Sequence, residues 1–232
     1  MKFDAYALKS RIAPAFVSMI VPIMLFNFFF SSPEFAKFVG DVLGAKIFAN
    51  LTISLVCLYY LSEAGRFVAK HVFERLYFKN ETYMPTTDLL MFENDTYSTD
   101  YKTRIRQRIK RDFKIQLPTP EEEAADNVIA RRRIVETMAL VRKKLAKNSL
   151  LSQHNTEYGA VRNLIGGSAI GLVFSMINIL FFSAVVKNPL AVYISIVTLA
   201  CYMVIILASR LLLSFYGFNY AKILFREYMG SA

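Results

Sequence analysis

Residues 163–186 read NLIGGSAIGLVFSMINILFFSAVV, a run of 24 residues without a single charged side chain. A hydrocarbon layer about 30 Å thick requires about 20 helical residues, so this run is long enough to span one. Further uncharged runs occupy 12–33, 47–62 and 188–209, and only 47–62 is a turn short. A short span can gain length from its flanks or lie in a thinner patch of bilayer. The sequence therefore predicts four transmembrane helices.

The rest of the chain is polar and basic. The whole sequence is 55% hydrophobic, yet it holds 28 Lys+Arg against 18 Asp+Glu, for a net charge of +10. The apolar fraction is too high for an intrinsically disordered chain. Cys57 and Cys201 both fall in predicted spans, so neither a disulfide scaffold nor a metal cluster is expected.

The basic residues indicate an orientation. Of the 28, 25 lie before the first predicted span, between residues 63 and 162, or after the last span. The positive-inside rule then places both termini and 63–162 in the cytoplasm. The first span is too long for a signal peptide and is expected to stay as an anchor. The predicted fold is an all-α membrane protein with an N-terminal transmembrane hairpin (1–62), a basic and mostly helical cytoplasmic domain (63–162), and a C-terminal hairpin with a cytoplasmic tail (163–232).

Two helices are predicted in the cytoplasmic domain. Apolar residues recur every fourth position over 99–116, at Tyr101, Ile105, Ile109 and Phe113. A second helix is predicted from a capping box at Thr119 and Glu122 to about residue 147. Its expected apolar face consists of Val128, Val135, Met138, Val141 and Leu145. The second span is expected to continue past Ser62 as one helical rod, and 80–100 to form a loop with some extended structure.

Nine cations in these two helices lie too far from any predicted span to be needed for orientation, because topogenic charge acts over about 15–20 residues. They are Arg104, Arg106, Arg108, Lys110, Arg111, Lys114, Arg131, Arg132 and Arg133. One interpretation is a site for nucleic acid, a nucleotide or anionic lipid, since arginine binds phosphate through a planar fork. Nearby Tyr97, Tyr101 and Phe113 would stack bases in that case. The other is pairing with acidic residues of the same fold, with the aromatic rings in the core.

The third predicted span carries a stripe of small and polar residues, Gly167, Gly171, Ser175 and Asn178. Such a stripe either permits close helix packing or frames a pore. Milder polar stripes occur in the second span (Asn50, Ser54, Cys57) and the fourth (Ser195, Thr198, Tyr202, Ser209). The absence of ionisable residues from the spans argues against a pump or an ion-coupled carrier. Four helices leave little room for a conduit, so a channel would require a ring of subunits.

Sequence motifs of enzymes are almost absent. The chain has no phosphate-binding loop, no dinucleotide-binding turn and no zinc-protease motif, and its only histidines are His71 and His154. Arg66 and His71 match the Arg-x4-His spacing of HEPN-type ribonucleases, although they also fit a helix just below the membrane. We expect no catalytic residues, no cofactor and no metal.

Four stretches carry a resemblance to a known family: MPTTDLLM (84–91), LPTPEEE (117–123), HNTEYG (154–159) and RNLIGG (162–167). Together with the basic helix they resemble small bacterial membrane proteins of anti-phage defence loci, in particular the membrane effector of Hailong-type defence. The resemblance covers roughly residues 83–171.

The resemblance implies a homo-oligomeric ion channel, with a tetramer favoured, in the bacterial inner membrane. In that family, short single-stranded DNA oligomers made by a partner nucleotidyltransferase hold the channel closed, and their loss depolarises the cell. No ligand-binding residue is carried over from it. The residues themselves leave three alternatives open: a channel that a cyclic nucleotide opens, a membrane-tethered ribonuclease, and a passive membrane scaffold.

Overall fold

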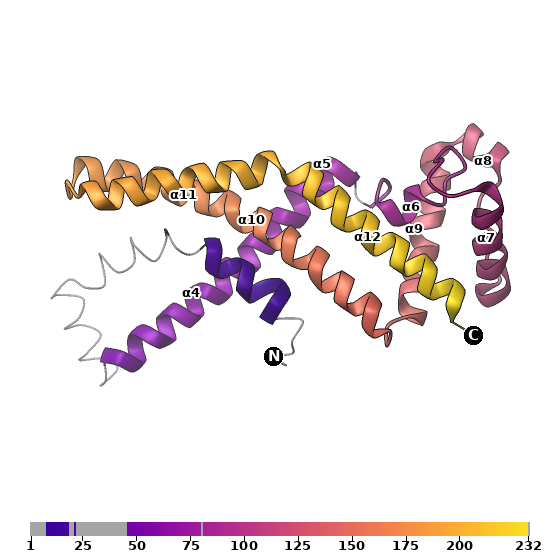
Figure 1. Ribbon diagram of the computed structural model, residues 1–232, viewed down its shortest axis with the longest axis horizontal. Coiled ribbons are helices and arrows are strands. Elements are labelled where there is room, and N and C mark those ends of the chain that lie inside the picture. The colour runs from indigo at the N-terminus through magenta and orange to yellow at the C-terminus, as the bar shows by residue number, and fades with distance from the viewer. Residues whose placement is uncertain (1–7, 19–20, 22–45, 80, 232) are drawn as a thin grey trace. The chain divides into compact units, whose positions relative to one another are not determined.

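The computed structural model describes residues 8–18, 21, 46–79 and 81–231, with side chains for all of these except 8, 46–55 and 57. Over this part of the chain the protein is all-helical and contains no strand (Figure 1). The elements are η1 (Leu8–Ile12), α4 (Lys46–Val68), η2 (Ala69–Glu74), α5 (Arg75–Phe78), α6 (Pro85–Asp88), α7 (Thr99–Phe113), α8 (Pro120–Ala125), α9 (Asn127–Lys144), α10 (Ser149–Ala184), α11 (Pro189–Leu207) and α12 (Ser209–Gly230), with η1 and η2 π-helical.

The chain divides into two compact units. Residues 1–72 and 159–209 form one, here called the apolar unit, and residues 73–158 and 210–232 form the other, the basic unit. One boundary falls inside α10, at Gly159. The basic unit holds 19 Lys+Arg and 14 Asp+Glu. Its positive charge is therefore largely matched by acidic residues of the same unit.

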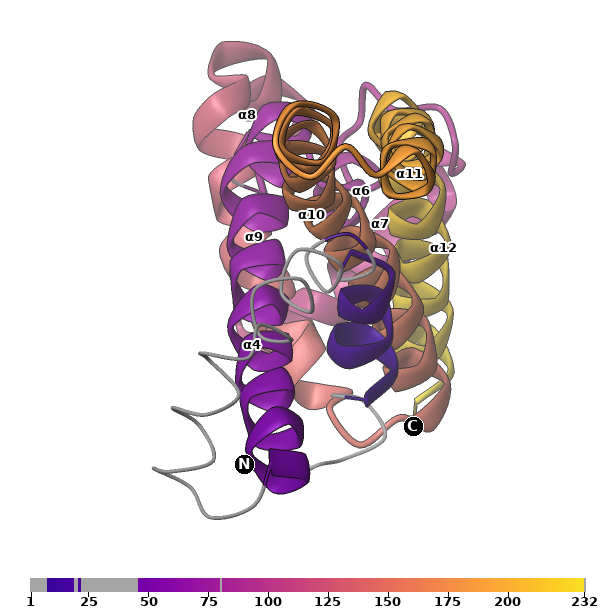
Figure 2. The same ribbon diagram turned by 90° about the vertical axis from the view of Figure 1, so that its left-hand side faces the viewer.

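Among the residues that the structure describes, two helices are long and apolar enough to cross a membrane, α10 and α11. They form an antiparallel hairpin joined by residues 185–188 (Figure 2), and Asn188 caps α11 by accepting a hydrogen bond from the Ala191 amide at 3.1 Å. They match the third and fourth predicted spans. The first predicted span, 12–33, lies largely outside the described residues. The second lies within α4, where most side chains are not described.

The helical rod predicted beyond Ser62 is confirmed, because α4, η2 and α5 follow one another without a break from residue 46 to residue 78. Within the apolar unit, this rod packs against α10 through glycine backbones. A Cβ atom on Gly166 would lie 2.0 Å from the Gly65 carbonyl oxygen and 2.7 Å from the Ala69 nitrogen. Only a residue without a side chain allows this approach.

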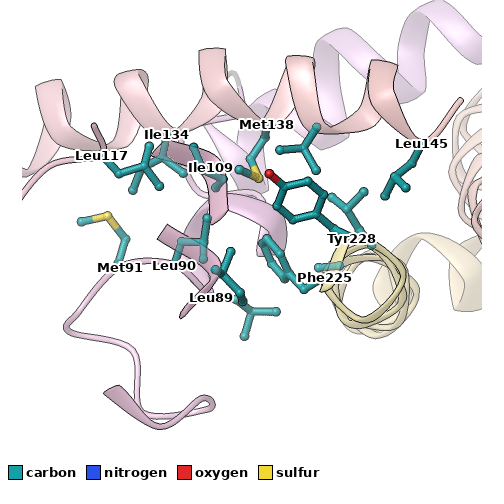
Figure 3. Packing of buried hydrophobic residues seen from close by; sticks show 14 of the residues in the cluster. Leu89, Leu90, Met91, Ile109, Leu117, Ile134, Met138, Leu145, Phe225 and Tyr228 are labelled. Atoms are coloured by element: carbon teal, nitrogen blue, oxygen red, sulfur yellow. The ribbon is translucent and has the colours of Figure 1, made fainter. Parts of the chain in front are cut away.

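The basic unit is built around one hydrophobic core (Figure 3). The predicted stripe on α7 is confirmed: Ile105 and Ile109 are fully buried, and Tyr101 and Phe113 pack against the core. The structure adds two further contributors. Leu89, Leu90 and Met91 come from the segment between α5 and α7, and α12 supplies Ala221, Leu224, Phe225 and Tyr228.

The helix predicted from residue 119 to residue 147 is interrupted. Its capping box is present, since Thr119 accepts from the Glu122 amide and the Glu122 carboxylate accepts from the Thr119 amide. However, Asp126 has an extended backbone (φ −147°, ψ 91°) and its carboxylate caps a new helix, α9, by accepting from the Ile129 amide at 2.9 Å. The chain therefore turns between α8 and α9.

The predicted apolar face of α9 is also partly wrong. Met138, Val141 and Leu145 are buried, but Val128 is 48% exposed. The buried face runs through Ile134 instead, six residues and about 240° around the helix from Val128. The predicted extended structure in 80–100 is not found: the described part holds the short helix α6 and turns.

Candidate anion-binding surface

The nine candidate cations separate into buried and exposed groups. Arg131 is buried, and Arg106 and Arg108 are nearly so, with side chains 11% and 12% exposed. The other six are exposed and are here called the outer cations: Arg104, Lys110, Arg111, Lys114, Arg132 and Arg133. Burial decides what each residue can bind, because a buried cation must already have partners in the fold.

Both terminal nitrogens of the Arg106 guanidinium donate to its own chain, whereas Nε has no hydrogen-bond partner among the described residues. Arg106 donates to the Glu123 carboxylate at 2.5 Å, to the Leu90 carbonyl oxygen at 2.6 Å and to that of Pro118. Its guanidinium lies 4.1 Å from the centre of the Phe92 ring. Burial lowers the pKa of Arg106, and the Glu123 carboxylate opposes that shift. The residue is a structural cation in this fold.

Arg131 has the same role on α9. Its side chain is 3% exposed and donates to the Asp88 carboxylate at 3.0 and 3.1 Å and to the Glu93 carboxylate at 2.5 Å. It also donates to the Thr82 carbonyl oxygen at 3.2 Å. The hydrogen bond from Arg131 is the main reason that the pKa of Glu93 falls below its usual value. These contacts join α9 to the segment that precedes α7.

Lys102, which is not among the nine candidate cations, completes this group. Its side chain is buried and its ammonium donates to the carbonyl oxygens of Met91 at 2.8 Å, Phe92 at 3.4 Å and Asn94. Burial lowers the pKa of Lys102. Together, Lys102, Arg106 and Arg131 hold residues 82–94 in place. We call these three the inner cations.

Arg108 connects α7 to α12. It donates to the Met229 carbonyl oxygen at 2.8 Å, and its guanidinium lies 5.1 Å from the centre of the Tyr228 ring. Asp112 lies 3.6 Å from it and also accepts from Lys144 at 2.7 Å and from the Tyr228 hydroxyl at 2.9 Å. The hydrogen bond from Lys144 is the largest of the effects that lower the pKa of Asp112 to about 2.

The outer cations have weak partners or none. Arg104 pairs with Asp100 at 2.9 Å, with both side chains at least two-thirds exposed. Arg111 lies 3.4 Å from Asp112, and Arg133 lies 3.5 Å from Glu122. In the part of the chain that the structure describes, Lys110, Lys114 and Arg132 have no acidic partner. Exposed ion pairs contribute about 0–1 kcal/mol, so all six cations can change partner at little cost.

The small and polar stripe of α10 is buried inside the apolar unit. A Cβ on Gly167 would lie 2.8 Å from the Ser18 hydroxyl oxygen, and one on Gly171 would lie 2.7 Å from the Tyr202 ring. Ser175 donates to the Gly171 carbonyl oxygen at 2.8 Å.

Asn178 belongs to the same buried stripe. It donates to the Val21 carbonyl oxygen at 3.1 Å, while its own side-chain oxygen has no hydrogen-bond partner among the described residues. All four residues of the stripe therefore face neighbouring helices of the same chain. The structure does not describe the side chains of the polar stripe in the second span, Asn50, Ser54 and Cys57.

Arg66 and His71 are placed on the same rod but have separate partners. Arg66 lies 3.5 Å from the Glu63 carboxylate. A ring nitrogen of His71 lies 3.0 Å from the Phe67 carbonyl oxygen, and the two rings stack at 4.3 Å. The described residues contain no group of three or more potential metal ligands.

The chain was also compared with known proteins. No family model, no curated protein and no solved structure matches it.

Proposed function

We propose that this protein is a ligand-gated membrane effector, in which the basic unit binds a phosphate-rich ligand and the apolar unit conducts ions. One observation carries the proposal. The inner cations are held by hydrogen bonds within the fold, whereas the outer cations remain exposed on a unit attached to two helices of membrane-spanning length. The ligand class is a nucleotide or a short single-stranded DNA oligomer.

The surface of α10 and α11 supports a place in a bilayer. The outward-facing apolar side chains include Val173, Met176, Leu180, Tyr193, Val204 and Leu207, each at least 53% exposed. Continuous apolar surface of this kind is unusual on a protein surrounded by water. Lipid would cover it, and the Hailong-type resemblance makes the bacterial inner membrane the expected location.

The exposed side of α7 supports the choice of a polyanion as ligand. Arg104, Arg111 and Lys114 recur at helical spacing on that side, with Lys110 beside them. A phosphodiester backbone supplies several negative charges at regular intervals and would release counterions on binding. We name the four together the outer stripe. A ligand held there is the proposed gating signal.

Ion conduction would require several copies of the chain. The small and polar stripe of α10 is used for packing within one chain, so a conduit would lie between subunits rather than within one. A ring of four is the arrangement that the resemblance favours. By the same resemblance, bound DNA oligomers close the channel and their loss opens it, with a partner nucleotidyltransferase as their source.

Ion flux through liposomes tests this function. Purified protein is reconstituted and the release of a K⁺ gradient is followed before and after a short single-stranded oligodeoxynucleotide is added to the exposed basic units. We expect flux without the oligomer and a several-fold reduction with it. Absence of flux under both conditions would show that the protein is not a channel.

Reversing the charge of the outer stripe tests whether this surface binds the oligomer. Changing Lys110, Arg111 and Lys114 to glutamate should leave basal flux intact and remove the response to the oligomer, because these residues lie outside the core. The matched control reverses Lys143 and Lys147, which are exposed near the end of α9. An equal response of both variants would place the ligand elsewhere.

A further inference from the structure

A pocket of about 410 Å³ lies in the basic unit where α12 meets the start of α7. It is lined by Tyr97 and Tyr101, by Lys222 and Arg226, and by Thr96, Ser98 and Ile223. None of the nine candidate cations lines it. Its volume is at the lower end of the range for small-molecule sites, about 300–1,000 Å³.

The two cations of the pocket are placed to act together. Lys222 and Arg226 are four residues apart on α12, so their side chains rise from the same face of the helix, one turn apart. Both are exposed, and Lys222 has no acidic partner in the described part of the chain. Arg226 lies only 3.5 Å from the neighbouring Glu227, whose carboxylate also accepts from Asn148 at 2.8 Å. Their positive charge is thus largely uncompensated.

The opposite wall is aromatic. Tyr97 and Tyr101 meet edge to face with ring centroids 4.9 Å apart, and Tyr97 packs further against Phe225 of the core. Packing against the core therefore fixes the positions of both rings. Burial raises the pKa of Tyr97 to about 12, so its phenol stays protonated near neutral pH and can donate a hydrogen bond.

We propose that this pocket binds one nucleotide, with the phosphate between Lys222 and Arg226 and the base against Tyr101 and Tyr97. Two cations one turn apart can pair with one phosphate. A tyrosine ring can stack against the planar ring of a base. This inference rests on the proposed function and deepens it. The outer stripe would bind the backbone of an oligomer, and the pocket would bind one of its nucleotides together with the base.

The test uses the full-length protein in detergent and a fluorescein-labelled oligodeoxynucleotide of about six residues, a length within the usual range of single-strand sites. Fluorescence anisotropy is measured for wild type, for Lys222→Gln with Arg226→Gln, and for Lys143→Gln with Lys147→Gln. The last pair is also four residues apart and exposed on the basic unit. We expect about a tenfold loss of affinity for the pocket pair and less than about threefold for the control. Equal losses would show that only the overall charge matters and would contradict the proposal that the pocket binds a nucleotide.

Competition distinguishes a nucleotide from other phosphates. Deoxyadenosine monophosphate should displace the labelled oligomer at a concentration about tenfold lower than inorganic phosphate does, because only the nucleotide carries a ring to stack. Tyr101→Leu should remove that difference and Tyr101→Phe should keep it, with thermal melting to confirm that both variants fold. Equal displacement by the two competitors would contradict base binding. If vesicles of phosphatidylserine depend on Lys222 and Arg226 for binding while the oligomer does not, the pocket is a lipid site and the inference is wrong.

These outcomes separate the inference from the proposed function. If wild type binds the oligomer and responds to it in the flux assay while the pocket variants behave as wild type, only the pocket fails. If wild type neither binds the oligomer nor passes ions, the proposed function fails and the pocket proposal falls with it.

Discussion

The two sides of α7 carry similar charge and have opposite roles. On the inner side, Lys102 is buried and Arg106 is nearly so, and they donate to backbone carbonyl oxygens and to Glu123. On the outer side, Lys110 and Lys114 are exposed without an acidic partner among the described residues. The contrast shows that a cluster of basic residues in a sequence is not one site. Burial assigns the inner residues to stability and leaves the outer ones accessible to solvent.

The largest expected effect is the loss of stability when one of the inner cations is replaced. Arg131→Met should lower the free energy of unfolding by about 2–3 kcal/mol, because Asp88 and Glu93, which are only partly buried, would lose the cation that pairs with them. Arg132→Met, one residue away and exposed, should change it by less than about 0.5 kcal/mol. Unfolding in detergent, followed by circular dichroism, measures both. Similar losses for the two variants would show that the inner and outer cations are not distinct.

The second largest effect is expected in the apolar unit, where a methyl group added at a glycine contact should lower stability. Gly166→Ala should cost about 1–3 kcal/mol, because the added methyl group would overlap the Gly65 carbonyl oxygen. Gly230→Ala is the matched control, since nothing lies within 4 Å of a Cβ there. The same unfolding measurement applies. A Gly166→Ala variant as stable as wild type would mean that α4 and α10 are further apart than the structure places them.

Asp112 provides a test that depends on pH. Its pKa is lowered from 3.8 to about 2, so its contribution to stability is present above pH 4 and is lost as the pH falls towards 2. Asp112→Asn should cost about 1–2 kcal/mol near neutral pH and flatten the pH dependence of stability between pH 4 and 2.

Asp100 serves as the control for Asp112, because it is 71% exposed and its ion pair with Arg104 lies at the surface. Asp100→Asn should change the free energy of unfolding by less than about 0.5 kcal/mol near neutral pH. If Asp112→Asn instead loses stability as steeply as wild type between pH 4 and 2, the strong pairing of Asp112 is wrong.

Local patterns in the sequence predicted the parts of the fold that depend on near neighbours. The spacing of Ile105 and Ile109 gave the buried face of α7, and Thr119 with Glu122 gave the start of α8. The break at Asp126 was missed because the acidic stretch around it resembles a first helical turn. Nevertheless, Asp126 followed by Asn127 is a capping signal that could have shown the break.

The partners of the candidate cations could not be predicted in the same way. Arg131 contacts residues 38–49 positions earlier in the chain, and those contacts exist only once residues 82–93 fold over the core. The place of α12 was also missed, although Ala221, Leu224, Phe225 and Tyr228 have helical spacing that indicates one buried face. Without α12, the pocket at Lys222 and Arg226 could not be foreseen.

The central claim is that the outer cations bind a phosphate-rich ligand. The dependence of oligonucleotide binding on salt concentration tests it most directly, because the slope depends on the number of contacts between cations and phosphates. For a single strand, the slope of log K against log salt concentration changes by about 0.7 for each phosphate contact. Replacing Lys110, Arg111 and Lys114 with glutamine should therefore flatten the slope by about 2 and leave the unfolding free energy unchanged. Replacing Lys143 and Lys147 should leave the slope as it is in wild type. An unchanged slope in the triple variant would contradict the assignment of the outer cations to a ligand.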